Sequence, residues 1–135
     1  MKLPAVAYFT TTALTVLVFA GSGVANLLRA EHMASDMVRL GYPAYFMTIL
    51  GVWKLLGAII MIAPGTPRLK EWAYAGMVFD LTGAAASRAS VHDSIQSVLI
   101  PLALTGVVLT SRALRPLHAH RSDQTIRQPQ AQSGR

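Results

Sequence analysis

From Ala5 to Leu28 the chain contains no charged side chain. A helix over this run has no polar stripe to turn toward water, which each helix of a soluble bundle needs. At a rise of about 1.5 Å per residue, the run is long enough to cross the roughly 30 Å hydrocarbon core of a bilayer. It also exceeds the roughly 7–15 apolar residues of a cleavable signal peptide. We therefore predict a retained transmembrane helix over residues 5–28.

The rest of the chain follows the same pattern. Hydrophobic residues make up 53% of the sequence and charged residues 13%, and the charges are bunched between the apolar runs. Such bunching is typical of a membrane protein. Further spans are predicted over residues 44–63, 69–87 and 94–111, the last with Pro101 near its middle. The predicted fold is all-α: residues 1–111 form one integral membrane four-helix bundle.

A short amphipathic segment lies between the first two predicted spans. From Arg29 to Leu40, Met33, Met37 and Leu40 fall on one helical face, and charged residues occupy the others. This pattern is typical of a helix that lies flat in the membrane interface. Gly41 is predicted to end the helix, because glycine readily adopts the left-handed conformation found there.

Two charges lie near the middle of predicted spans. Lys54 and Asp80 flank a Pro-Gly-Thr-Pro turn at similar sequence distances, so an antiparallel hairpin would bring them to one depth. An isolated Lys or Asp at the bilayer centre costs about 2.5–3.5 kcal/mol on insertion scales. We therefore predict that they pair in a buried polar centre. Asn26, on the inward face of the first span, is a further candidate because a buried amide needs partners.

Other side chains in the spans have simpler predicted roles. Thr11 and Thr15 are expected to bond to their own helix backbone, and Trp72 and Tyr74 to anchor the third span at an interface. Small residues share a helical face with each central charge, which predicts a close approach of a neighbouring backbone. They are Gly51, Gly57 and Ala58 around Lys54, and Gly76, Gly83, Ala84 and Ser87 around Asp80.

The chain contains no cysteine. This excludes disulfides, thiolate metal sites and Cys-x-x-Cys redox chemistry, and with them the four-helix thiol oxidases. His118 and His120 have no further ligands nearby, so we predict no metal site. No flavin, haem or nucleotide motif is present, so we predict no cofactor held by the chain alone, and an enzyme would need a diffusible cofactor or a partner.

The formal net charge is +6, and most Lys and Arg residues outside the predicted spans lie with the two termini and the 63–71 turn. The positive-inside rule therefore predicts that both termini are cytoplasmic. Residues 112–135 are rich in Arg, Gln, Ser and His, and we predict a disordered basic tail that contacts anionic lipid. Because the basic excess has this explanation, nucleic acid is not an expected partner.

Four runs of the sequence, taken together, resemble one known family. They are LGYPAYF at Leu40–Phe46, LGVWKLLGA at Leu50–Ala58, LKEWAYAGMVFDLTGAAAS at Leu69–Ser87 and ALRP at Ala113–Pro116. The combination is similar to the DoxX-like family of small bacterial four-helix membrane proteins. The resemblance implies a location in the inner membrane and, from the name-giving member, quinone-linked sulfur oxidation. Arg88 is the fourth residue of the candidate polar site, and close relatives in this family commonly have His at its position.

Three classes of function fit these residues. In the favoured one, the chain is a non-enzymatic membrane subunit or accessory protein, and Lys54 and Asp80 form a structural latch. In the second, a quinone or small solute binds beside them, one of the two charges relays a proton, and an oxidoreductase partner is involved. In the third, the chain is a small transporter that assembles as a homo-oligomer, because four helices enclose little volume.

Overall fold

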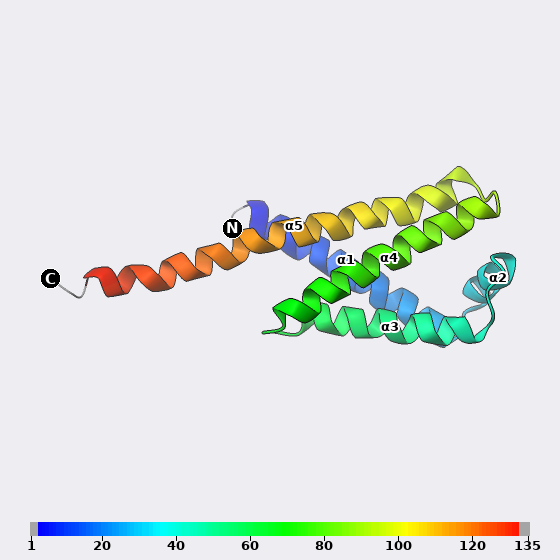
Figure 1. Cartoon of the computed structure of the whole chain (residues 1–135), viewed down its shortest axis with the longest axis horizontal. Helices are drawn as coiled ribbons and strands as arrows, with labels where there is room; N and C mark the ends of the chain where they lie inside the picture. Colours follow the sequence, from blue (N-terminus) through cyan, green and yellow to red (C-terminus); the bar gives the residue numbers. More distant parts are fainter. Residues whose placement is uncertain (1–2, 133–135) are drawn as a thin grey trace.

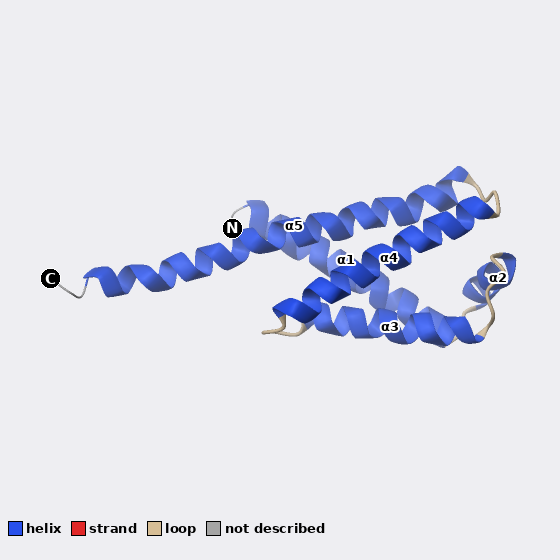
Figure 2. Ribbon diagram, in the orientation of Figure 1, coloured by secondary structure: helices blue, strands red, loops and turns tan. Residues whose placement is uncertain are grey.

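The computed structural model describes residues 3–132, and the side chains of residues 3–115. Every regular element in that part of the chain is a helix, as predicted (Figure 2). In chain order the helices are α1 Leu3–Leu27, α2 Glu31–Arg39, α3 Tyr45–Ile62, α4 Pro67–Ser90 and α5 Ile95–Gln132 (Figure 1). The four long helices cover the four apolar segments, and α2 covers the amphipathic one.

The long helices form two close pairs that cross. Helix α1 packs against α3, and α4 packs against α5. The pairs are joined because α1 also contacts α5, and α3 also contacts α4. In Figure 1, α4 lies near α3 at the 63–66 turn and near α5 at the opposite end, where α2 also lies. We call the end with the 63–66 turn the closed end and the end with α2 the open end.

The buried core lies toward the closed end. Its apolar side chains come from all four long helices: Phe19, Ala58, Met61, Ala73, Tyr74, Met77, Leu81 and Val108. Tyr74 corrects one prediction, because it is 1% exposed and lies in this core instead of at an interface. The Tyr74 hydroxyl is 2.9 Å from the Ser111 hydroxyl. The Ser111 hydroxyl is in turn 2.7 Å from the Thr12 hydroxyl. A buried tyrosine needs such a partner, which the sequence pattern did not reveal.

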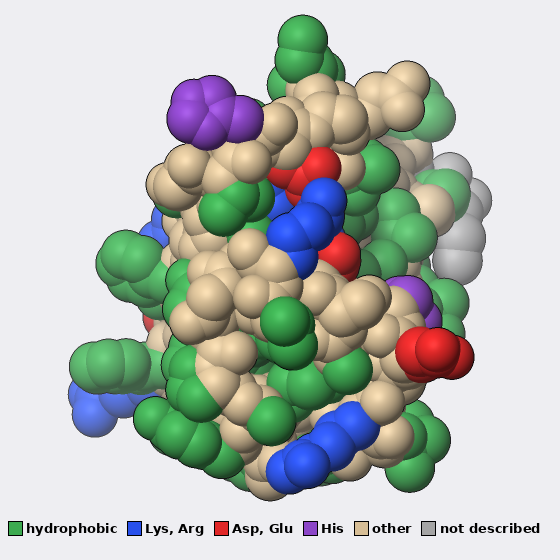
Figure 3. Space-filling model, turned by 90° about the vertical axis from the view of Figure 1, so that its right-hand side faces the viewer, with side chains coloured by type: hydrophobic (Ala, Val, Ile, Leu, Met, Phe, Trp, Pro, Cys, Tyr) green, Lys and Arg blue, Asp and Glu red, His purple; other side chains and the backbone are tan. Residues whose placement is uncertain are grey.

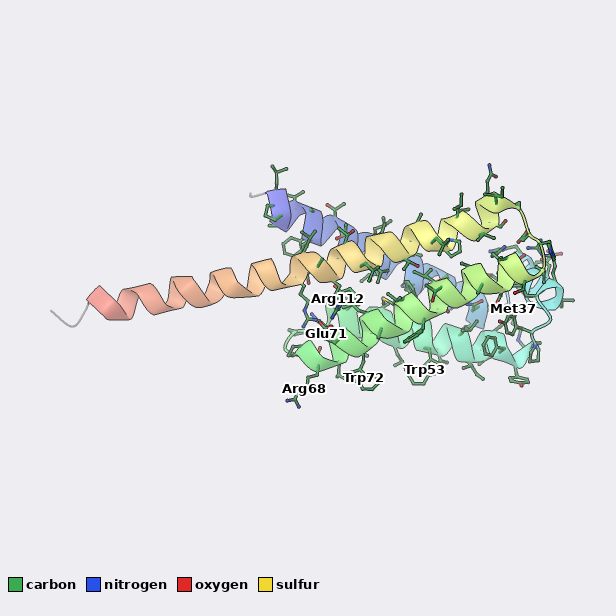
Figure 4. All side chains as sticks on the ribbon, turned by 45° about the horizontal axis from the view of Figure 1, so that its top comes forward. Met37, Trp53, Arg68, Glu71, Trp72 and Arg112 are labelled. Carbon is green, nitrogen blue, oxygen red and sulfur yellow. The ribbon has the colours of Figure 1, made fainter. Side chains whose placement is uncertain are left out.

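Large apolar side chains also cover the outside of the bundle. Trp53 and Trp72 point away from it in Figure 4, and they are 68% and 79% exposed. Three helical segments are long and apolar enough to cross a membrane: Leu3–Leu27, Tyr45–Ile62 and Ile95–Arg115. Helix α4 is not among them. Its charged residues are Arg68, Lys70, Glu71, Asp80 and Arg88.

Helix α2 ends where the sequence predicted. Gly41 has φ +80°, a left-handed conformation that glycine adopts without steric cost. The Gly41 N–H donates to the Val38 carbonyl at 3.1 Å, and the Tyr42 N–H donates to the Met37 carbonyl at 2.9 Å. This pair of bonds is a Schellman motif, which turns the chain from α2 toward α3.

Helix α5 is longer than predicted. The sequence ended the fourth span at residue 111 and began a disordered tail at residue 112, but α5 continues to Gln132. Glu71 explains the first part of the difference: Arg112 Nε and Arg115 Nη1 each donate to its carboxylate at 2.9 Å. Figure 4 shows Arg112 beside Glu71.

Candidate functional site

A cavity of about 480 Å³ lies at the open end between the two helix pairs. All five helices contribute to its walls; α2 contributes Met33, Asp36 and Met37, and Leu40 follows directly after α2. The four residues that the sequence predicted for a polar site, Asn26, Lys54, Asp80 and Arg88, all line it. The volume falls in the range of about 300–1,000 Å³ that is usual for small-molecule sites.

Lys54 and Asp80 form an ion pair in the cavity wall. Lys54 Nζ lies 3.5 Å from Asp80 Oδ2, and the two side chains are 16% and 20% exposed. The pair joins α3 to α4, and therefore one helix pair to the other. Asp80 follows the buried Met77 and precedes Gly83, which lines the cavity. The ion pair thus lies at the boundary between the closed-end core and the cavity.

The small residues around Lys54 permit the close approach that was predicted. A Cβ added to Gly51 would lie 2.9 Å from the Gly23 carbonyl oxygen and 2.7 Å from Leu27 Cγ. A Cβ added to Gly23 would lie 3.1 Å from Lys54 Cβ. These two glycines let α1 and α3 cross closely, and the crossing fixes the base of the Lys54 side chain.

The small residues around Asp80 have a different role from the one predicted. A Cβ added to Gly76 or Gly83 would meet nothing within 4 Å among the described residues. Gly83, Ala84 and Ser87 instead line the cavity. Their small side chains leave room between the helix pairs, which the sequence could not distinguish from a close helix contact.

Asn26 is buried in the wall formed by α1 and is 1% exposed. Its Oδ1 atom has no hydrogen-bond partner among the described residues. Thr11 and Thr15 of the same helix bond to the carbonyls of Ala7 and Thr11 at 2.7 and 2.8 Å, as predicted. Asn26 therefore differs from Thr11 and Thr15 in that no described residue donates a hydrogen bond to its Oδ1.

Arg88 belongs to a ring of charged side chains under α2. The sequence did not predict this ring. Its Nη2 donates to Asp36 Oδ2 at 2.6 Å, and its Nη1 donates to Asp93 Oδ2 at 3.1 Å. Arg39 closes the ring, because its Nη2 donates to Asp36 Oδ1 at 3.1 Å and to Asp93 Oδ2 at 2.8 Å. Viewed from this end, basic side chains lie between acidic ones (Figure 3).

The charge ring connects α2 and the turn after α4. Asp93 is its best-held carboxylate: the Ser94 backbone N–H and then the Arg39 guanidinium lower the pKa of Asp93 below its ordinary value. A second link lies nearby. The hydroxyls of Tyr42, which follows α2, and of Ser87, near the end of α4, are 2.7 Å apart. The signal for this ring was that basic and acidic side chains balance in both connections: two Arg, one Glu and one Asp in residues 28–44, and Arg88 and Asp93 in the last connection.

Pro101 also lines the cavity. A proline in a helix removes one backbone donor and restricts the preceding turn. The Thr105 hydroxyl donates to the Pro101 carbonyl at 2.8 Å, so part of this wall is braced from within α5. Pro101 therefore forms part of the cavity wall contributed by α5.

Metal ligands do not gather in this site. Among the described residues, no group of three or more His, Asp or Glu side chains could hold a metal ion. His118 and His120 lie outside the residues whose side chains are described. The site is therefore defined by the cavity, the ion pair, the charge ring and Asn26.

Comparison with known families matches residues 10–111 to the DoxX-like family. The chain belongs to the DoxX-like family. The match covers the cavity and all of its lining residues, so the site described above lies in the part that defines membership. No curated protein and no solved structure matches this family member.

Proposed function

We propose that this DoxX-like protein is a non-enzymatic, multi-pass membrane protein that binds a small, largely apolar molecule in the cavity under α2. The observation that supports the proposal is the cavity itself, of about 480 Å³ and lined mainly by apolar side chains with a few polar groups. Such walls are typical of small-molecule sites. A latch between Lys54 and Asp80 holds the two helix pairs around it.

In this proposal α4 is the fourth span. Its inner charges have partners, since Asp80 lies beside Lys54 and Arg88 beside Asp36 and Asp93. Paired charges that face a bundle interior are the ones that membrane helices tolerate. Four spans put both termini on one side of the inner membrane, and the excess of Lys and Arg there makes that side cytoplasmic, with α2 flat on the outer interface. Fusions of a phosphatase that is active only in the periplasm, made after Gly65 and after Arg115, test this topology. An active phosphatase at either site contradicts it.

Binding is tested by nuclear magnetic resonance on methionine methyl groups in lipid nanodiscs. Met33 and Met37 line the cavity, whereas Met61 and Met77 lie in the core. The probe is 1-adamantanol, a compact neutral molecule. We expect saturable shifts of the Met33 and Met37 methyl signals, with little change in the core methionines.

Two alanines of α4 provide the matched control. Ala84 lines the cavity, and Ala86 is exposed and does not. Ala84→Phe should abolish the saturable shifts because the ring fills the cavity, and Ala86→Phe should leave them unchanged. Equal binding by both variants, or no saturable binding by the wild-type protein, contradicts the proposed function.

A redox-linked role with an oxidoreductase partner is the second candidate. The observation that favours it is the ion pair in the wall of an apolar cavity, since a quinone ring fits such walls and Lys54 can donate to a carbonyl oxygen. A bound quinone would supply two-electron chemistry, and Asp80 could hold a proton beside it. Asp80→Asn would then leave the protein folded and reproduce the phenotype that deletion of the whole protein causes. An unchanged phenotype contradicts this role.

A further inference from the structure

The charges around the cavity are already paired with one another. Lys54 lies beside Asp80, and Arg88 bonds to Asp36 and Asp93. A charged ligand would therefore bring an uncompensated charge into a mainly apolar space, which is costly. The arrangement favours a neutral ligand over an ionic one.

Asn26 defines what a neutral ligand must offer. It is 1% exposed, it lines the cavity, and its Oδ1 has no partner among the described residues. A buried acceptor without a donor costs stability, so a molecule that supplies a donor gains from satisfying it. Ser22, one turn earlier, is not that donor, because its hydroxyl donates to the Phe19 carbonyl at 3.4 Å.

We infer that the cavity selects neutral alcohols with an apolar body, and that the ligand hydroxyl donates a hydrogen bond to Asn26 Oδ1. This inference rests on the proposed function and names its ligand class. The apolar body packs against the rest of the lining, to which α2 contributes Met33 and Met37, and α3 contributes Phe46 and Leu50.

The same cavity reaches the outer surface of the bundle. Phe79 of α4 and Ile100 of α5 both line it, yet they are 76% and 61% exposed. Apolar side chains exposed on a membrane bundle face lipid. An alcohol dissolved in the bilayer can therefore reach the cavity from the side without crossing the charge ring under α2.

The test compares three probes that share one cage: 1-adamantanol, its methyl ether and the ammonium compound 1-adamantanamine. Their dissociation constants are measured from the Met33 and Met37 methyl signals in nanodiscs, as above. The ether cannot donate a hydrogen bond, so it should bind about tenfold more weakly than the alcohol. The ammonium compound can donate but carries a charge, so it should also bind more weakly than the alcohol.

Substitution of Asn26 provides the second arm. Asn26→Leu keeps a similar volume and removes the acceptor, so alcohol and ether should bind that variant equally. Thr11→Val is the matched control on the same helix, and it should keep the preference for the alcohol because Thr11 lies outside the cavity lining and its hydroxyl donates to the Ala7 carbonyl within α1.

The outcomes separate the two proposals. Equal binding of alcohol and ether by the wild-type protein, or tighter binding of the ether or the ammonium compound, overturns the alcohol inference and leaves the binding function standing. A preference for the alcohol that survives in Asn26→Leu also overturns it. Saturable binding by none of the probes counts against both proposals. The wild-type comparison alone decides the case if Asn26→Leu does not fold.

Discussion

The closed and open ends of the bundle use polar residues in opposite ways. At the closed end, Tyr74 and Ser111 are 1% and 0% exposed, and their hydroxyls are hydrogen-bonded to each other. At the open end, Asn26 is just as buried, but its Oδ1 has no partner among the described residues. A satisfied buried group fixes packing, whereas an unsatisfied one beside a cavity is suited to a ligand. Under the proposed function, the closed end supplies stability and the open end binds the ligand.

The two ends also differ in how their helices are held. Tyr74, Met77 and Val108 fill the closed end and are each at most 3% exposed. At the open end the helix pairs are linked by the charge ring and the Tyr42–Ser87 contact instead of by a continuous core. Polar links contribute less stability than close packing does, so the open end should tolerate larger changes.

The largest expected effect is at the closed end. Tyr74→Ala removes a buried ring and should lower the free energy of unfolding by about 3–5 kcal/mol. Phe46→Ala, which removes a cavity-lining ring stacked on Tyr42 at 4.9 Å, should cost only about 1–2 kcal/mol. Unfolding in mild detergent, followed by circular dichroism, measures both. Equal losses would remove the contrast between the ends.

A control isolates the hydroxyl of Tyr74. Tyr74→Phe keeps the ring and breaks only the bond to Ser111, so it should cost about 1 kcal/mol. A loss as large as that of Tyr74→Ala would mean that the polar contact, and not packing, stabilises the closed end.

The next effect concerns the ion pair at the boundary between the ends. Removal of one partner from a pair such as Lys54 and Asp80 leaves a charge unmatched, and because both side chains are partly exposed we expect a cost of about 1–3 kcal/mol. Lys54→Met combined with Asp80→Leu should recover most of that loss. A double-mutant cycle measured by unfolding in detergent gives the coupling. Additive effects would show that the pair does not link the two helix pairs.

The sequence predicted the helices and the pairing of Lys54 with Asp80 because both depend on local spacing. Apolar run length predicts a helix, and depth along a hairpin predicts which charges meet. The sequence also predicted that Asn26 faces inward, since an amide is conspicuous in an apolar helix, and the side chain is buried. These predictions needed only the chain's own periodicity.

The sequence did not predict contacts that join distant segments. The charge ring connects Asp36 and Arg39 with Arg88 and Asp93, and nothing in the spacing indicates that α2 folds back over the end of α4. Arg112 and Arg115 were assigned to the tail because composition changes there, but Glu71 holds both. The role of Gly83 was also hidden, since a small residue can serve a helix contact or a cavity equally well.

The smallest expected effect is a pH-dependent loosening of α2 at the open end, with no matching change at the closed end. Ser94 and Arg39 lower the pKa of Asp93 below its ordinary value of about 3.8. A carboxylate with a lowered pKa stabilises the folded state above its ordinary value, and the contribution is lost as the pH falls through the lowered value. The chain has no cysteine, so a spin label at Met33→Cys reports α2 alone. The label should be equally ordered from pH 5 to 8 and become more mobile only as the pH falls below 3.8 toward the lowered pKa of Asp93. Asp93→Asn should be mobile at every pH, because it cannot hold Arg39 and Arg88 as a carboxylate does. A label that stays ordered in Asp93→Asn would show that packing, and not the charge ring, holds α2 over the cavity.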